Sequence, residues 1–212
     1  MRKAVLGLLV APFLMAAADG GAMNDAERAY LIDQLEQSKR AMLASIDGLS
    51  EAQWKFKPAP NVWSVQECAE HIILAEDYIF NGAQSVLKTP AVPRPERSNA
   101  EVDHRLVAGV QDRSNKLTAP EPLRPAAKFA APADAAREFI ARRDKTIAYV
   151  KTTQDDLRIH VGPGPAGPMD AYQFLLLLAS HSARHTAQIL EVEANSSYPK
   201  SAAGSKAVYQ GD

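Results

Sequence analysis

The sequence has one cysteine in 212 residues, no excess of basic side chains and no long uninterrupted apolar run. The single cysteine, Cys68, cannot form a disulfide within the chain, so the fold must be held together by its core. A formal net charge of −1 leaves no basic stripe, which argues against nucleic acid as a partner. Alternation of apolar and polar residues is absent too, so helices rather than strands are expected.

The N-terminus carries a short apolar segment that follows two basic residues. Two basic residues precede the apolar stretch Ala4–Ala16, and the small residues 16–18 form a cleavage signal. The stretch is too short for a comfortable membrane span, so residues 1–18 are predicted to be a signal peptide; a retained anchor is the alternative. Cleavage would leave 22 basic against 25 acidic side chains, and would export a bacterial protein, periplasmic or secreted, without stable membrane insertion.

Four segments carry apolar residues at helical spacing. Two of them begin at residue patterns typical of a capping box, in which a side chain at the helix start and one three residues later each bond the other's backbone. Four long amphipathic helices predict an all-α protein folded as a four-helix bundle, in a domain of residues 24–194. The predicted helices cover residues 24–46, 65–87, a stretch beginning at 133, and 170–194.

The remaining parts of the chain lack this periodicity. Residues 89–131 are rich in proline, with one short helical pattern at 100–117, and so long a connector is more often functional or mobile than idle. The glycines and prolines of 162–168 exclude a helix or a central strand. Residues 195–212 are small, polar and unpatterned, and are predicted to form a flexible C-terminal tail.

Three histidines lie on the apolar faces of two predicted helices. His181 and His185 are four residues apart, which places both imidazoles on one helix face, and His71 lies at the edge of another apolar stripe. If the two helices pack face to face, three neutral imidazoles can hold a divalent metal with an open fourth position, as in catalytic sites. Ordinary core histidines, bonded to carboxylates or carbonyls, are the alternative, because this spacing also arises by chance.

Polar residues beside the histidines are candidates for supporting roles. Glu67 and Glu70, expected on the exposed side of the helix, could accept a hydrogen bond from an imidazole, although Glu67 also belongs to a capping box. Glu70 is one predicted catalytic residue, as a general base, whereas Glu76 should point elsewhere. Gln188 is the other, bonding either a metal-bound water or His185; a core amide bonded across helices is its alternative.

The two histidine segments together resemble a known family. The pattern W-S-V-x-E-x-x-x-H, which ends at His71, and the pattern H-x-x-x-H-x-x-Q-I, which begins at His181, are similar in order and spacing to the DinB/YfiT-like family of metalloenzymes. The resemblance covers roughly residues 27–194. It implies a four-helix bundle with up-down-down-up topology, a divalent metal held by His71, His181 and His185, and often a homodimer. Zn, Ni, Mn and Fe are all compatible with such ligands.

The resemblance leaves the reaction open. A metal with three histidine ligands lowers the pKa of its bound water, which suits hydrolysis of an ester or amide in an unknown small-molecule substrate. The same site could activate a thiolate for S-transfer or isomerisation, but export to an oxidising exterior favours hydrolysis. A non-catalytic bundle that binds metal or a small ligand is a further alternative. Substrate choice is expected to depend on the 89–131 connector.

Overall fold

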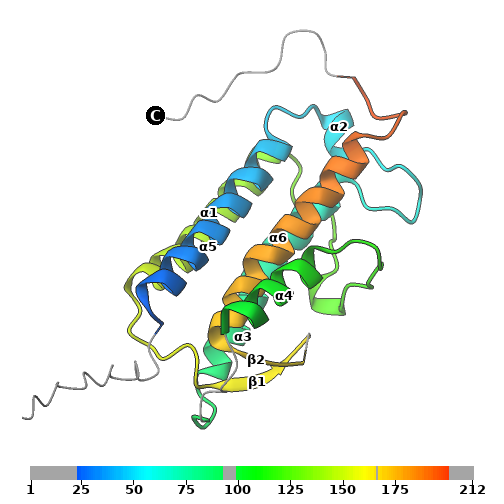
Figure 1. The fold of residues 1–212 in the computed structure, drawn as a ribbon. Helices are drawn as coiled ribbons and strands as arrows, with labels where there is room; N and C mark the ends of the chain where they lie inside the picture. The colour runs from blue at the N-terminus through cyan, green and yellow to red at the C-terminus, as the bar shows by residue number, and fades with distance from the viewer. Residues whose placement is uncertain (1–22, 93–98, 166, 201–212) are drawn as a thin grey trace, which may run out of the picture.

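The structure, a computed structural model, describes residues 23–92, 99–165 and 167–200. The predicted signal peptide lies outside the described residues, so export stays a prediction. The homodimer also stays a prediction, because a single chain does not test it. Most of the described chain is helical (Figure 1). The elements are α1 (Asp25–Ile46), α2 (Glu51–Lys55), α3 (Val65–Val86), α4 (Asn99–Gln111), the 3-10 helix η1 (Glu121–Leu123), α5 (Pro132–Thr152), β1 (Val161–Gly164), β2 (Gly167–Asp170) and α6 (Ala171–Glu193).

Three of the long helices begin at capping boxes. In each, the cap side chain accepts a hydrogen bond from a backbone amide three residues later, and that residue's side chain accepts one from the backbone amide of the cap. The predicted starts of these helices are therefore confirmed. The pairs are Asn24 with Glu27, Ser64 with Glu67, and Asp170 with Gln173.

The long helices pack into a helical bundle. Helix α6 contacts α1, α3 and α4, and α5 contacts α1 and α3 (Figure 1). Two apolar clusters fill the interior, one around Leu35, Ile79 and Leu175, the other around Trp54 and Ile72. No helix of the described part is both long and apolar enough to cross a bilayer. Burial of these side chains is the main favourable contribution to folding.

A two-stranded antiparallel ribbon joins α5 to α6, where no strand was expected. Val161 pairs with Asp170, and Pro163 lies opposite Pro168. The chain reverses at Gly167, whose φ of +100° lies in the left-handed region that favours glycine. In a two-stranded ribbon both strands are edges, so prolines without an N–H are tolerated. The prediction that this segment contains no central strand holds, but the prediction of no strands was wrong.

Two other boundaries differ from the predictions. Helix α4 ends at Gln111, six residues before the predicted end, and Arg184 donates hydrogen bonds to the carbonyl of Val110 in its last turn and to that of Asp112 just beyond it. Residues 195–200 are not a free tail: Tyr198 packs edge-on against the ring of Phe56, with centroids 5.5 Å apart. The rest of the predicted tail, 201–212, lies outside the described residues.

Candidate metal centre

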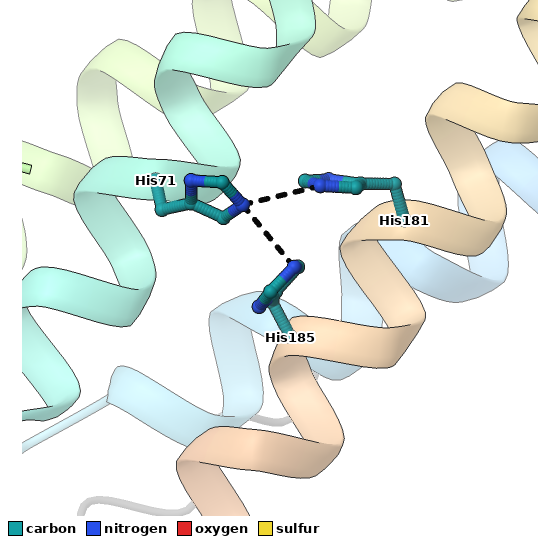
Figure 2. A group of neighbouring side chains, drawn as sticks. All are labelled: His71, His181 and His185. Carbon is teal, nitrogen blue, oxygen red and sulfur yellow. Dashed lines mark hydrogen bonds between the residues drawn. The ribbon is translucent and has the colours of Figure 1, made fainter. Parts of the chain in front are cut away.

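The three histidines converge on one point between α3 and α6. His71 projects from α3, and His181 and His185 project from consecutive turns of α6 toward it (Figure 2). The Nε2 atom of His71 lies 3.2 Å from the Nε2 atoms of both His181 and His185. One ligand atom from each ring lies within 4.8 Å of the others. The structure thus brings together the three histidines that the sequence singled out, two by their spacing and all three through the family resemblance.

Hydrogen bonds on the far side of two rings indicate which nitrogen carries the proton, with Gln188 placed so that its Oε1 faces His185. His71 Nδ1 lies 2.7 Å from the carbonyl oxygen of Leu123, and His185 Nδ1 lies 2.8 Å from Oε1 of Gln188. Both oxygens only accept, so each Nδ1 must donate and each Nε2 must carry a bare lone pair in a neutral ring. Two bare nitrogens 3.2 Å apart repel each other unless a cation lies between them.

The surroundings keep the imidazoles neutral. Burial lowers the pKa of His71, although the bond to Leu123 acts in the opposite sense. Burial, followed by repulsion from the neighbouring rings, lowers the pKa of His181 well below its ordinary range. For His185, burial and then the charge of His71 lower the pKa to about 3. A proton is therefore a poor bridge between the rings, and the neutral imidazole is the form that binds metal ions.

The donor set fits a divalent transition metal. Imidazole nitrogens bind such ions at about 2.0–2.1 Å, so two ligands in a tetrahedral arrangement lie about 3.3 Å apart. The 3.2 Å distances from His71 to the two other Nε2 atoms agree with this value. The Nδ1 atom of His181 is buried and has no hydrogen-bond partner in the described part of the chain.

Glu70 lies in an unexpected place. It is 3% exposed rather than on the solvent side, because residues of the connector cover this face of α3. Its carboxylate accepts hydrogen bonds from the backbone amides of Ala126 and Lys128, at 3.1 and 2.8 Å. The prediction that Glu70 is exposed was wrong, since a single-helix pattern could not show which segment packs on top of it. Its predicted role as a general base is not supported by these contacts.

The other predicted polar residues fall into two groups. Gln188 contacts His185, as one of its two predicted alternatives required. Glu67 instead binds Lys57 and the start of α3, and Glu76 points away from the histidines, as predicted, to pair with Arg143. The acceptors that hold the imidazoles are thus an amide side chain and a carbonyl rather than carboxylates.

Two neighbours of the histidines were not singled out from the sequence. The carbonyl of Leu123 comes from a distant part of the chain and gives no sequence signal. The indole of Trp63 packs beside His71 and His185, with ring centroids 4.8 and 6.1 Å away. Trp63 opens the W-S-V pattern and was therefore visible in the sequence. Cys68, with its pKa raised to about 12 mainly by burial, is a core thiol.

Comparisons with known proteins identify the family of this chain. Residues 34–189 match the model of the DinB superfamily. YuaE of Bacillus subtilis (strain 168), an uncharacterised protein, is 27% identical over 149 residues, which cover 70% of this chain and 88% of YuaE.

The structure of YfiT from Bacillus subtilis, described as a probable metal-dependent hydrolase with an unusual four-helix bundle topology, also resembles this one. It aligns with a TM-score of 0.54 and 14% identity over 81% of this chain and 88% of YfiT, a likeness of fold. Since the family model spans most of the chain and both histidine segments, the chain belongs to the DinB superfamily.

Proposed function

We propose that this protein is a metal-dependent hydrolase whose divalent transition metal is held by His71, His181 and His185. The observation that carries the proposal is the convergence of Nε2 atoms, two of which are bare acceptors 3.2 Å apart. The description of YfiT as a probable metal-dependent hydrolase supports the same reading.

Each part of the site has a role in this proposal. A divalent cation bound by three neutral imidazoles lowers the pKa of a bound water toward neutrality, and thereby supplies hydroxide for hydrolysis. Leu123 and Gln188 hold the rings of His71 and His185 in the tautomer that presents Nε2. The indole of Trp63 packs beside the rings of His71 and His185 and restricts how they can turn.

We also infer that the four long helices run up-down-down-up. Contacts at one end of the bundle support this order, because they join the start of α1 to the end of α5, the end of α3 to the end of α5, and the start of α1 to the start of α6. The contacts are Arg28 to the Thr153 carbonyl at 3.1 Å, Phe80 on Tyr149 with centroids 5.4 Å apart, and the Tyr172 hydroxyl to the Glu27 carbonyl at 2.8 Å.

Metal analysis tests the site first. Protein purified without chelators should carry about one transition-metal ion per chain, measured by elemental analysis. His181→Ala/His185→Ala should carry none, whereas His104→Ala, which removes a histidine packed edge-on against Tyr30 outside the site, should retain it. Wild-type protein that takes up no stoichiometric transition metal would contradict the proposal.

Turnover tests the reaction. Metal-loaded protein should hydrolyse members of a panel of esters and amides, and His185→Ala should lose this activity while keeping its helical circular dichroism. Metal uptake without turnover would identify a binding protein instead. Turnover only with thiol acceptors would identify a transferase.

A further inference from the structure

The connector segment Leu123–Phe129 is fastened to the bundle at both ends. At one end, the Leu123 carbonyl accepts the hydrogen bond from His71 Nδ1 at 2.7 Å. At the other end, the Phe129 carbonyl accepts hydrogen bonds from Gln66 Nε2 at 2.7 Å and from Trp54 Nε1 at 3.0 Å. The segment thus links α2 and α3 to one of the proposed metal ligands.

Glu70 binds the middle of this segment. Its two carboxylate oxygens accept hydrogen bonds from the backbone amides of Ala126 and Lys128, which lie on either side of Ala127. Ala127 has a φ of 58°, in the left-handed region that residues with a side chain rarely adopt. Such a turn can direct nearby backbone amides toward one anion. The carboxylate therefore compensates for an unfavourable backbone conformation.

The position of Glu70 connects the turn to the metal centre. It directly precedes His71 on α3, yet its carboxylate bonds backbone amides of the connector. The turn that it binds begins three residues after Leu123, whose carbonyl orients the His71 ring. Leu123 is 6% exposed and packs in the apolar core, so displacement of its carbonyl is resisted from two sides.

We propose that Glu70 is a positioning residue for His71. By holding the turn at 126–128, it keeps the Leu123 carbonyl on His71 Nδ1, and this bond places the proton on Nδ1 and leaves Nε2 free for the metal. The inference rests on the proposed metal site, and it gives a buried acidic side chain beside a ligand a role that requires no contact with substrate.

Glu70→Gln tests the proposal with nearly unchanged side-chain volume. The amide has one acceptor oxygen, so one of the two backbone amides loses its partner and faces an NH₂ group instead. We expect the affinity for Zn²⁺ or Co²⁺, measured by competition with a chromophoric chelator, to fall about 10–100-fold, as for other residues that orient metal ligands. Glu67→Gln is the matched control, because glutamine also serves in a capping box; it should bind metal like the wild type.

The tautomer of His71 provides a readout without metal. Long-range ¹H–¹⁵N spectra of the metal-free protein should show the proton on Nδ1 in the wild type and in Glu67→Gln, and a mixture of tautomers in Glu70→Gln. A loss of general stability would not shift the proton in a protein that stays folded. Should Glu70→Gln not fold, Glu70→Asp replaces it, since aspartate keeps the charge but cannot reach both amides.

The outcomes separate this inference from the proposed function. Wild-type metal affinity together with an unchanged tautomer in the Glu70 variant would overturn the positioning role. If the wild type itself binds no metal, the proposed function fails, and the tautomer comparison still decides whether Glu70 acts on His71.

Discussion

Two polar clusters lie beside each other in this bundle, a buried one around Arg143 and a partly buried one of three histidines. They differ in whether each hydrogen-bond donor faces an acceptor. The Arg143 cluster consists of Arg143, Glu76, Ser38 and Ser182, together with the Leu35 carbonyl. The histidine cluster consists of His71, His181 and His185. Ser182 directly follows His181, so the two clusters share one turn of α6.

In the Arg143 cluster, the N–H donors of the guanidinium each face an oxygen acceptor. Arg143 is fully buried; its Nε and Nη2 bind the Glu76 carboxylate at 2.9 and 2.5 Å, and its Nη1 binds Ser38 at 2.7 Å. These contacts join α1, α3, α5 and α6 through one guanidinium. A polar cluster that satisfies itself in this way has a structural role and no remaining capacity for a ligand.

In the histidine cluster, two hydrogen-bond acceptors face each other with no donor of the described chain between them. The Nε2 atoms of His71 and His185 face each other, while both Nδ1 atoms are occupied. A buried polar group without a partner costs free energy, so this arrangement is expected where a ligand completes it. The comparison indicates that balance of donors and acceptors, rather than burial of polar groups, distinguishes a binding site from a structural network.

The largest effect on the free energy of unfolding is expected from removing the guanidinium of the Arg143 cluster. Arg143→Met keeps most of the side-chain volume but leaves the buried Glu76 carboxylate without its charged partner, with only the Ser182 hydroxyl, among the described residues, bonded to it. We expect the free energy of unfolding, measured in urea, to fall by about 3–5 kcal/mol. The double variant Arg143→Met/Glu76→Leu should recover most of this loss, because it removes the unpaired charge. A loss below about 1 kcal/mol in the single variant would mean that this cluster does not hold the bundle together.

The histidine cluster should contribute to the free energy of unfolding mainly when a metal ion is bound. A cation that binds only the folded state at 100 times its dissociation constant adds about 2.7 kcal/mol to the free energy of unfolding. We expect this gain for the wild type in urea titrations with and without Zn²⁺, and none for His181→Ala/His185→Ala. Arg143→Met should retain the gain if it folds. An equal gain in the double histidine variant would place the metal elsewhere.

The same contrast explains what the sequence could predict. Capping residues such as Asn24 and Ser64 act within one helical turn, so they located the helix starts. Helical spacing placed His181 and His185 on one face, whereas His71, at the edge of its apolar stripe, was joined to them through the family resemblance. Caps and helical spacing are short-range patterns, and short-range patterns are readable in one sequence.

Hydrogen-bond partners that distant segments of the chain contribute could not be predicted from the sequence. Glu70 looked exposed because its cover, the turn around Ala127, lies more than fifty residues away. The Leu123 carbonyl is a backbone atom, and any residue type could supply it. Arg143 reads as one more charge on a helix, yet it is fully buried. Burial of a charge depends on a partner that the sequence does not pair with it.

The smallest effect on the free energy of unfolding is expected at Gln188, which supports the histidine cluster through one hydrogen bond to His185. Gln188→Leu removes the acceptor on His185 Nδ1 from a half-buried position, so the free energy of unfolding should change by less than about 0.5 kcal/mol. The affinity for Zn²⁺ should nevertheless fall about 10–100-fold, because the ring loses its preferred tautomer. Gln188→Glu keeps an acceptor at this position and should retain the affinity. Unchanged affinity in Gln188→Leu would show that the geometry of α6 alone orients His185, and that balance matters only for the nitrogens that face the metal.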